Sequence, residues 1–327
     1  MSMLADFALR RPATLAEAAA LLSAHPEARL LAGGTDLVAN IRHGLDRPAL
    51  LIDLGAVQAL RELVLDREAL HIGAGVSLAQ LAADAAVLQD FPALAQAARL
   101  IAGPAHRVAG TVGGNLCLDT RCVFYNQSEW WRRSNHYCLK RDGETCHVAP
   151  QGKRCHAAYS GDLAPVLLVL EAELELVSRA GTRRVPLTAL YRDDGARHLT
   201  LEHGEILVSV RVLRPVADLR TGYRKARVRG AMDFPLAGVA VALALDAHGR
   251  LNTFRLGLTG TNSYPLLLEG TNALIGRPAD EAALSALGKL VQKQVSPMRT
   301  TVTASNYRRQ VAAVLAQRLL RELAQPR

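Results

Sequence analysis

The sequence lacks any apolar run long enough to cross a membrane. Its longest apolar runs cover residues 163–170 and 236–245, whereas a membrane-spanning helix needs about 18 apolar residues or more. The apolar core of a signal peptide is also missing, because Asp6 interrupts the only apolar stretch near the N-terminus. We therefore expect a protein of the cytoplasm, without a membrane span.

Cysteine is absent from most of the chain, since all five cysteines lie between positions 117 and 155. A disulfide scaffold would distribute its cysteines along the chain and would need an oxidising compartment, so the pattern argues against that class. A tight group of cysteines in a cytoplasmic protein is instead typical of a metal or redox site.

Acidic residues are in the minority, because the 327 residues include 30 Asp and Glu against 39 Lys and Arg, for a net charge of +9. Such an excess fits nucleic acid, an acidic partner protein or simple solubility. The composition, 50% hydrophobic and 21% charged, excludes disordered and fibrous chains. The length predicts about two domains of ordinary size.

The first part of the chain alternates short strands with short helices. The capping-box pair Thr14 and Glu17 predicts a helix at residues 15–23, and Ser77 with Gln80 has the same spacing. The apolar pattern predicts further elements, namely strands at 29–32, 49–54 and 70–72 and a helix at 91–102.

The second part of the chain is rich in strands and ends in helices. Strands are predicted at 183–187, 206–212, 222–229, 236–245 and 251–258, with the spacing of an antiparallel sheet. Helices are predicted at about 279–291 and 303–323. We therefore expect an α+β protein with one domain at residues 1–214 and another at 215–327, divided where Pro215 interrupts the strand pattern.

Two glycine pairs stand where a phosphate cradle is expected, in the segments LAGGTDL at 31–37 and TVGGN at 111–115. A pyrophosphate needs backbone N–H groups that point at it and no Cβ in the way, which glycine pairs can supply. Neither segment matches the dinucleotide fingerprint or the P-loop, so a plain turn between strands stays an alternative for each. Two such segments in one domain favour a nucleotide.

Residues 119–160 differ in character from the rest of the chain. They contain four of the five cysteines, both tryptophans, and seven positive against four negative side chains, with little apolar periodicity. Such a segment cannot build a core of its own and needs a metal or its host domain as a staple. We interpret it as an insertion in the first domain.

The four cysteines of the insertion are Cys122, Cys138, Cys146 and Cys155. They form neither the close pairs typical of structural zinc nor the run of a bacterial ferredoxin. Four thiolates on a core-poor loop still fit a cubane iron–sulfur cluster, and the alternative is a set of buried, inert cysteines. We expect Cys117 to be a small buried residue beside the second glycine segment. Histidines on the loop are alternative ligands, namely His136, His147 and His156.

These motifs together resemble the FAD-binding medium subunits of the xanthine dehydrogenase, or molybdenum hydroxylase, family. The resemblance extends over the whole chain and includes the two glycine segments, GDLAP at 161–165 and YRKARVRGAMDFP at 223–235. The insertion resembles that of the β subunits of 4-hydroxybenzoyl-CoA reductases, down to the stretch TRCVFYNQSEWW at 120–131. The resemblance implies an FAD-binding domain of the vanillyl-alcohol-oxidase (PCMH) type, carrying an iron–sulfur loop, and then an α+β C-terminal domain.

The resemblance also implies site residues. The FAD pyrophosphate would be held by Leu30, Leu31, Ala32, Gly33, Gly34, Thr35, Asp36, Leu37, Thr111, Val112, Gly113, Gly114 and Asn115. Further contacts to FAD would come from Ile101, Asp162, Leu207 and Lys225, and a [4Fe–4S] cluster from Cys122, Cys138, Cys146 and Cys155. Without the family, Ile101 and Leu207 would be interpreted as core residues and Asp162 as a helix cap. Lys225 would be a surface lysine, although a cation near the flavin favours its anionic reduced form.

The function that the resemblance implies is electron transfer in a molybdenum-containing 4-hydroxybenzoyl-CoA reductase. Reduced ferredoxin would supply electrons through [4Fe–4S] and FAD to a small [2Fe–2S] subunit and a large molybdopterin subunit, in a dimer of heterotrimers. The nearest alternative is an oxidative family member that passes electrons from FAD to NAD or a quinone. A zinc-stapled nucleic-acid-binding module is a rival of another class, but the cysteine spacing fits no zinc finger, and we expect no nucleic-acid partner.

Overall fold

A small parallel sheet forms the N-terminal edge of the molecule, whose computed structural model describes residues 6–325. Its strand order is β1 (Ala8–Arg10), β3 (Leu50–Asp53), β2 (Arg29–Leu31), and the connecting helices are α1 (Leu15–Ala24) and α2 (Leu37–Arg42). Helix α1 begins as predicted, because the Thr14 side chain accepts a hydrogen bond from the Glu17 amide at 3.2 Å. Residues 1–5 and 326–327, the outer ends of the two expected domains, lie outside the described residues.

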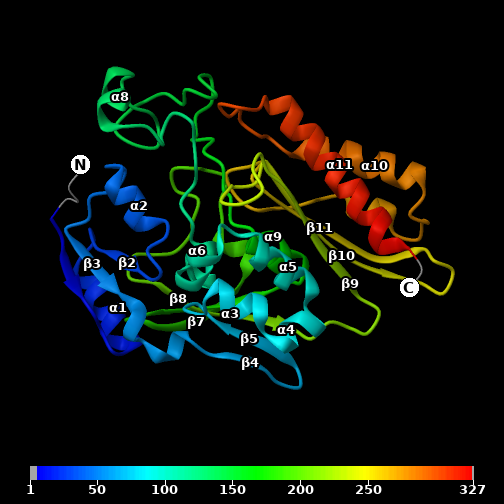
Figure 1. The fold of residues 1–327 in the computed structure, drawn as a ribbon, viewed down its shortest axis with the longest axis horizontal. Helices are drawn as coiled ribbons and strands as arrows, with labels where there is room; N and C mark the ends of the chain where they lie inside the picture. The colour runs from blue at the N-terminus through cyan, green and yellow to red at the C-terminus, as the bar shows by residue number, and fades with distance from the viewer. Residues whose placement is uncertain (1–5, 326–327) are drawn as a thin grey trace.

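A five-stranded antiparallel sheet is the base of the first domain, in the order β4-β5-β8-β6-β7. Its strands are β4 (Leu63–Leu65), β5 (Ala69–Gly73), β6 (Glu173–Ser178), β7 (Gly181–Pro186) and β8 (Ile206–Leu213). Figure 1 shows short helices over this sheet, namely α3 (Leu78–Ala83), α4 (Ala85–Asp90), α5 (Pro92–Leu100), α6 (Pro104–Ala109) and α9 (Leu163–Val169). The short helix α7 (Val112–Leu116) follows α6 in the chain and also contacts this sheet, at β5 and β8. Sheet and helices share one buried apolar core. Short 3-10 turns lie at Leu54–Ala56, Gln58–Leu60, Leu187–Leu190 and Thr271–Leu274.

The C-terminal part is a four-stranded antiparallel sheet between two layers of helices. The strand order is β12 (Leu266–Leu267), β11 (Leu251–Thr259), β10 (Ala237–Leu245), β9 (Arg220–Ala226). Helices α10 (Glu281–Gln294) and α11 (Ser305–Ala324) cover one face, and α5 and α9 of the first domain lie against the other (Figure 1). The α+β fold expected from the sequence is thus confirmed.

Strand β10 shows why its sequence, AGVAVALAL, is apolar at every position. Successive side chains of a strand point to opposite faces. Val239, Val241 and Leu243 belong to the core under α10 and α11, whereas the smaller Ala240 and Ala242 belong to the core of the first domain. The small face permits close packing across the boundary: a Cβ on Gly257 of the neighbouring strand β11 would overlap the backbone carbonyl of Pro165 in α9.

The expected antiparallel sheet of the second part is divided differently in the structure. The strands predicted at 183–187 and 206–212 are β7 and β8, which belong to the five-stranded sheet of the first domain. Only the strands predicted at 222–229, 236–245 and 251–258 form the C-terminal sheet, as β9, β10 and β11. The spacing of the strands predicted antiparallel pairing correctly but could not say which sheet each strand joins.

Residues 119–160 form an irregular projection, drawn in green near the top of Figure 1, with the short helix α8 (Glu129–Ser134). An antiparallel bridge between Arg121 and Ala158 closes its base, with both hydrogen bonds at 2.8 Å. The projection contacts the loop after α2, where the Tyr125 hydroxyl donates to the Leu45 carbonyl at 3.1 Å. None of the three apolar clusters within residues 6–325 includes a side chain from 120–158. No helix in that described range is long and apolar enough to cross a membrane.

Candidate functional site

A cavity of about 1130 Å³ lies between the two glycine segments, the insertion and the loops of the C-terminal sheet. Of the residues that the resemblance implies for FAD, only Leu31 and Val112 do not line it. Leu31 ends strand β2, and Val112 is buried in the core below. The lining residues from the implied set are Leu30, Ala32, Gly33, Gly34, Thr35, Asp36, Leu37, Ile101, Thr111, Gly113, Gly114, Asn115, Asp162, Leu207 and Lys225.

The first glycine segment presents unused hydrogen-bond donors to this cavity. It runs from the end of β2 to the start of α2, and the amides of residues 33–37 donate to no acceptor within the described part of the chain. Successive free amides in a turn make a concave site for an anion. This segment therefore has the geometry of a phosphate cradle.

The second glycine segment is a helix, α7, and its amides are already used. Thr111 caps this helix by accepting a hydrogen bond from the Gly114 amide at 3.1 Å. The amides of Val112 and Gly113 donate to Val76 and Ala74, and the Asn115 amide donates to Thr111. The expectation that both glycine pairs offer amides to a phosphate is therefore wrong for this segment, because the amides of Gly113 and Gly114 already donate to Ala74 and Thr111. Within the described residues, the Thr111 amide, the side chains of the segment and the open face at Gly114 are left for a ligand.

Three polar side chains form a buried network, and two of them, Lys225 and Asp162, line the cavity. Lys225 on β9 donates to the Asp162 carboxylate at 3.0 Å and to the Leu100 carbonyl at 3.1 Å. The Tyr223 hydroxyl donates to the other carboxylate oxygen of Asp162 at 2.6 Å. The side chains of Lys225 and Asp162 are only 1% and 4% exposed. Burial raises the pKa of Asp162, and the charge of Lys225 and the hydrogen bond from Tyr223 oppose that shift.

The network changes the interpretation of two residues. Asp162 precedes α9 but makes no capping hydrogen bond, and the first amide of that helix, at Leu163, donates instead to Asn115 at 3.0 Å. Lys225 is buried rather than a surface lysine at the end of a strand. Ile101 and Leu207 are 8% and 6% exposed, so they are core residues that also line the cavity.

Arg308 on α11 is a cavity residue that the sequence reasoning missed. It is 3% exposed, has no acidic partner within residues 6–325, and donates to the carbonyls of Leu236, Met298 and Gly260. Burial lowers its pKa to about 10. The sequence contained one indication of this role. Arg308 lies four residues before Ala312, on the apolar face of an amphipathic helix, where an arginine is unusual.

Four cysteines of the insertion are partly or fully buried, Cys122 and Cys138 in part and Cys146 and Cys155 fully. Burial raises the pKa of Cys122, and that of Cys155 to about 12. Cys122 also lines the cavity, so the cysteine group and the cavity adjoin.

Two of these sulfurs already accept hydrogen bonds from backbone amides. The Phe124 amide donates to Cys122 Sγ and the Ala157 amide to Cys155 Sγ, each at 3.4 Å. Between residues 6 and 325, no group of three or more His, Cys, Asp or Glu side chains is arranged to hold a metal ion. The four cysteines of the insertion, Cys122, Cys138, Cys146 and Cys155, therefore do not surround a single ion. Cys117 lies apart after α7 and lines the cavity, and burial raises the pKa of its thiol to about 12.

Ion pairs use most of the positive charge of the insertion. Five of its seven basic side chains pair with carboxylates, in the pairs Arg121–Asp36, Arg132–Glu129, Lys140–Asp119, Arg141–Asp142 and Arg154–Asp193. Arg133 and Lys153 are exposed and make no ion pair with any described residue. The surface of the insertion is therefore less positive than its composition suggests.

Two family profiles match the chain. The one described as "FAD binding domain in molybdopterin dehydrogenase" matches residues 5–215, and "CO dehydrogenase flavoprotein C-terminal domain" matches residues 221–323.

The chain is also similar to known proteins along its whole length. It is 28% identical to the xanthine dehydrogenase FAD-binding subunit of Escherichia coli O157:H7, over 97% of this chain and 96% of that one. It is 27% identical to the carbon monoxide dehydrogenase medium chain of Afipia carboxidovorans, over 96% and 95%. A chain in the crystal structure of a Cu,Mo-CO dehydrogenase superposes with a TM-score of 0.81 at 25% identity, over 98% of this chain and 99% of that chain.

Proposed function

The chain belongs to the family of FAD-binding medium subunits of molybdenum hydroxylases such as xanthine and CO dehydrogenase, and from this premise we propose that it is the electron-transfer subunit of such a complex. The observation that carries the proposal is the single cavity that joins the free amides of residues 33–37 to the buried pair of Lys225 and Asp162. When bound, FAD supplies a carrier that takes up and releases electrons.

The residues around the cavity fit FAD in two ways. The free amides of residues 33–37 would donate to the pyrophosphate, and Thr111, Gly114 and Asn115 line the same cavity. Lys225 would hold a positive charge beside the flavin, and Asp162 and Tyr223 would fix the position of that charge. Leu31 and Val112 would support these walls from behind without touching the cofactor.

We propose the same assembly that the resemblance implies, with a large molybdopterin subunit and a small [2Fe–2S] subunit in a dimer of heterotrimers. The name "medium chain" of the CO dehydrogenase relative supports a place between larger and smaller subunits. We also keep the division at residues 214 and 215 as a proposal, because the five-stranded and four-stranded sheets lie on either side of it. The cytoplasmic location stays a prediction.

We further propose that the insertion binds a [4Fe–4S] cluster through Cys122, Cys138, Cys146 and Cys155. Two observations support it: the amide hydrogen bonds to the sulfurs of Cys122 and Cys155, and the lack of an apolar core in the loop. The four thiols do not surround a single ion. A cubane binds each thiolate to a different iron, which places the sulfurs farther apart than around one metal ion.

The direction of electron flow has two candidates. The relatives named above are dehydrogenases, so they favour an oxidative complex that delivers electrons from FAD to NAD or a quinone. The cysteine-bearing insertion favours the second candidate, a 4-hydroxybenzoyl-CoA reductase that takes electrons from ferredoxin. An acidic ferredoxin would meet the exposed face of the insertion, where Arg133, Lys153 and the 75% exposed Trp130 are available.

The deciding experiment is the analysis of the co-expressed complex for flavin, iron and acid-labile sulfide, followed by two assays. FAD bound to this chain is expected, and its absence would refute the proposal. Flavin without iron in this chain would remove the cluster and leave the oxidative candidate. Dehydroxylation of 4-hydroxybenzoyl-CoA with reduced ferredoxin would select the reductase, whereas substrate-dependent reduction of NAD or a quinone would select the oxidative complex.

A further inference from the structure

The first residues of the insertion reach the cavity. Arg121 lines the cavity together with Asp36 of the first glycine segment, and its guanidinium forms an ion pair with the Asp36 carboxylate. A second nitrogen of the same guanidinium donates to the Asn40 side chain on α2 at 2.8 Å. Each side chain of the ion pair is 22% exposed. Arg121 therefore connects the insertion to the segment that carries the free amides of the phosphate cradle.

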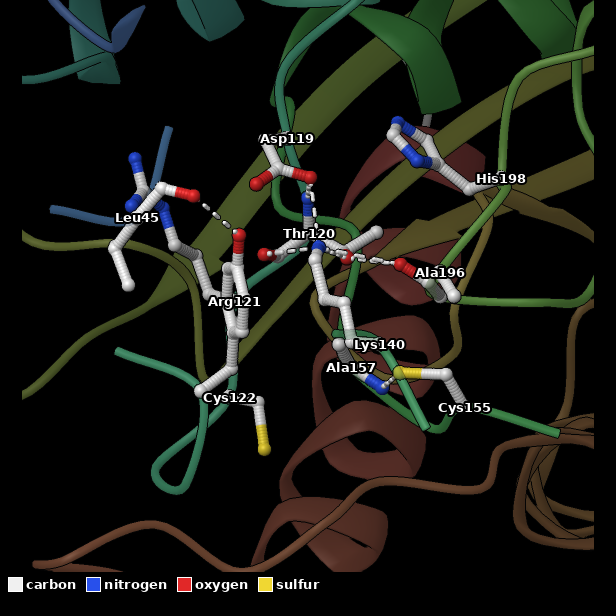
Figure 2. Close-up of polar contacts among 12 residues, drawn as sticks. Leu45, Asp119, Thr120, Arg121, Cys122, Lys140, Cys155, Ala157, Ala196 and His198 are labelled. Carbon is white, nitrogen blue, oxygen red and sulfur yellow. Dashed lines mark hydrogen bonds and ion pairs between the residues drawn. The ribbon is translucent and has the colours of Figure 1, made fainter. Parts of the chain in front are cut away.

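The backbone on either side of Arg121 is held in place. The Arg121 amide donates to the Ala158 carbonyl and the Ala158 amide donates to the Arg121 carbonyl, both at 2.8 Å. The Asp119 amide donates to the Asp36 carboxylate at 3.3 Å, and the Asp119 carboxylate accepts a hydrogen bond from the Lys140 ammonium at 2.7 Å. Figure 2 shows this stretch of the insertion, with the Lys140 ammonium reaching Asp119. A fixed stretch of backbone thus positions the guanidinium against Asp36.

Asp36 places a negative charge beside a site for an anion. Its amide is one of the free amides of residues 33–37, so its carboxylate lies within one residue of the phosphate cradle. A carboxylate and a pyrophosphate repel each other, and like charges that are brought together lower the affinity of a complex. The repulsion is stronger in a partly enclosed cavity than in water, because the effective dielectric constant is lower. The guanidinium of Arg121 offsets this negative charge.

The guanidinium keeps one donor unused and lies against an aromatic ring. Arg121 Nε is buried and has no hydrogen-bond partner among residues 6–325. The central carbon of the guanidinium lies 5.1 Å from the centre of the Phe234 ring, on the loop between β9 and β10. Phe234 also lines the cavity. Arg121 therefore stands where the insertion, the first glycine segment and a loop of the C-terminal sheet meet.

We propose that Arg121 positions the phosphate cradle for FAD, an inference that rests on the proposed binding of FAD in this cavity. Arg121 acts through Asp36. The ion pair holds the Asp36 side chain and offsets its charge, so that the amides of residues 33–37 can receive the anionic pyrophosphate without a competing carboxylate. The insertion is therefore part of the FAD site, and this role needs no metal in the insertion.

The test is the dissociation constant of FAD for the flavin-free full chain, measured by isothermal titration calorimetry. In Arg121→Gln it should rise about tenfold or more, because the Asp36 carboxylate is left uncompensated beside the pyrophosphate. Arg154→Gln is the matched control. It also breaks an ion pair of the insertion, with Asp193 at 2.7 Å, but neither Arg154 nor Asp193 lines the cavity, so its affinity for FAD should equal that of wild type.

Two further variants separate charge from structure. Arg121→Gln combined with Asp36→Asn leaves no charge at the pair and should bring the dissociation constant back to within about threefold of wild type. A merely structural role of Arg121 would not produce this recovery. Asp36→Asn alone should bind FAD more tightly than wild type, because the charge of the guanidinium is then no longer neutralised and acts on the pyrophosphate.

The outcomes distinguish this inference from the proposed function. A wild-type chain that binds no FAD overturns the proposed function, and this inference with it. If wild type binds FAD, equal affinities of Arg121→Gln and Arg154→Gln overturn the inference alone, as does a double variant that binds no more tightly than Arg121→Gln. If circular dichroism shows that Arg121→Gln does not fold, Asp36→Asn decides: tighter binding supports the inference, and unchanged or weaker binding overturns it.

Discussion

The buried pair of Lys225 and Asp162 allows a quantitative prediction. Lys225→Met removes the ammonium from a pair whose side chains are 1% and 4% exposed and lie 3.0 Å apart. The Asp162 carboxylate then stays buried with the Tyr223 hydroxyl as its remaining polar side-chain partner. Loss of one partner from a buried ion pair costs about 3–5 kcal/mol, because the other charge is left uncompensated. We expect the free energy of unfolding of the flavin-free chain at neutral to alkaline pH to fall by this amount.

The loss should depend on pH in a defined direction. Burial raises the pKa of Asp162 in the folded chain, and removal of the neighbouring positive charge raises it further. A carboxyl group whose folded pKa lies above its unfolded value stabilises the fold fully at low pH, and this stabilisation is lost as pH rises through the folded pKa. The difference between variant and wild type should therefore shrink as pH falls from alkaline to mildly acidic values, where Asp162 of the variant takes up a proton.

The assay is urea unfolding of the flavin-free full chain, followed by tryptophan fluorescence and circular dichroism. It is run once at an alkaline pH and once at a mildly acidic pH. Flavin is left out because bound FAD would add its own stabilisation. The double variant Lys225→Met with Asp162→Asn should recover most of the loss, since it leaves no buried charge. Lys153→Met, at an exposed site, should stay within about 0.5 kcal/mol of wild type. The reasoning is refuted if Lys225→Met is as stable as Lys153→Met at alkaline pH, or if the second substitution adds to the loss.

Two further predictions concern the cofactors. Cys146→Ser should lose the iron of this chain and keep FAD, whereas Cys117→Ser, a change outside the proposed ligand set, should keep both. Iron and flavin analysis of the two variants checks this prediction. Full iron content in Cys146→Ser would contradict the assignment of Cys146 as a ligand. Gly114→Leu should lower FAD occupancy several-fold with an unchanged circular dichroism spectrum, because Gly114 lines the cavity and a Cβ there would meet only the Thr111 hydroxyl, at 3.1 Å. Gly230→Leu is the matched control, because a Cβ on Gly230 would meet no atom within 4 Å and Gly230 does not line the cavity. Equal flavin content in the two variants would count against FAD binding at Gly114.

Local signals in the sequence predicted much of the fold. Thr14 with Glu17 and Ser77 with Gln80 mark helices whose first turns are capped by the expected side chains. Such pairs lie three residues apart and need no partner from elsewhere in the chain. The division of strands between two sheets could not be predicted in this way, because β8 pairs with β5 across more than 130 residues of sequence. Alternating apolar patterns reveal a strand but do not identify its neighbours.

The candidate site was predicted less completely for the same reason. Asp162 has the sequence position of a helix cap, and only its contact with Lys225, which is 63 residues away, shows that it belongs to a buried ion pair. The two glycine pairs are alike in sequence, yet only the first keeps its amides free, because the amides of Gly113 and Gly114 donate to Ala74 and Thr111. The positive charge counted on the insertion likewise gave no sign that Arg121, Arg132 and Arg154 are paired with carboxylates.

The small face of β10 has a consequence for electron transfer. Ala240 and Ala242 let the C-terminal sheet approach the first domain closely, and β11 meets α9 where Gly257 leaves no room for a side chain. A seam packed in this way is a fixed joint rather than a hinge, because any opening would expose apolar surface along the whole strand. Lys225 and Asp162 come from opposite sides of that seam, and Cys122 borders the same cavity. The ammonium of Lys225 would thus keep one position beside a bound flavin while electrons enter and leave it, because the seam fixes both members of the buried pair.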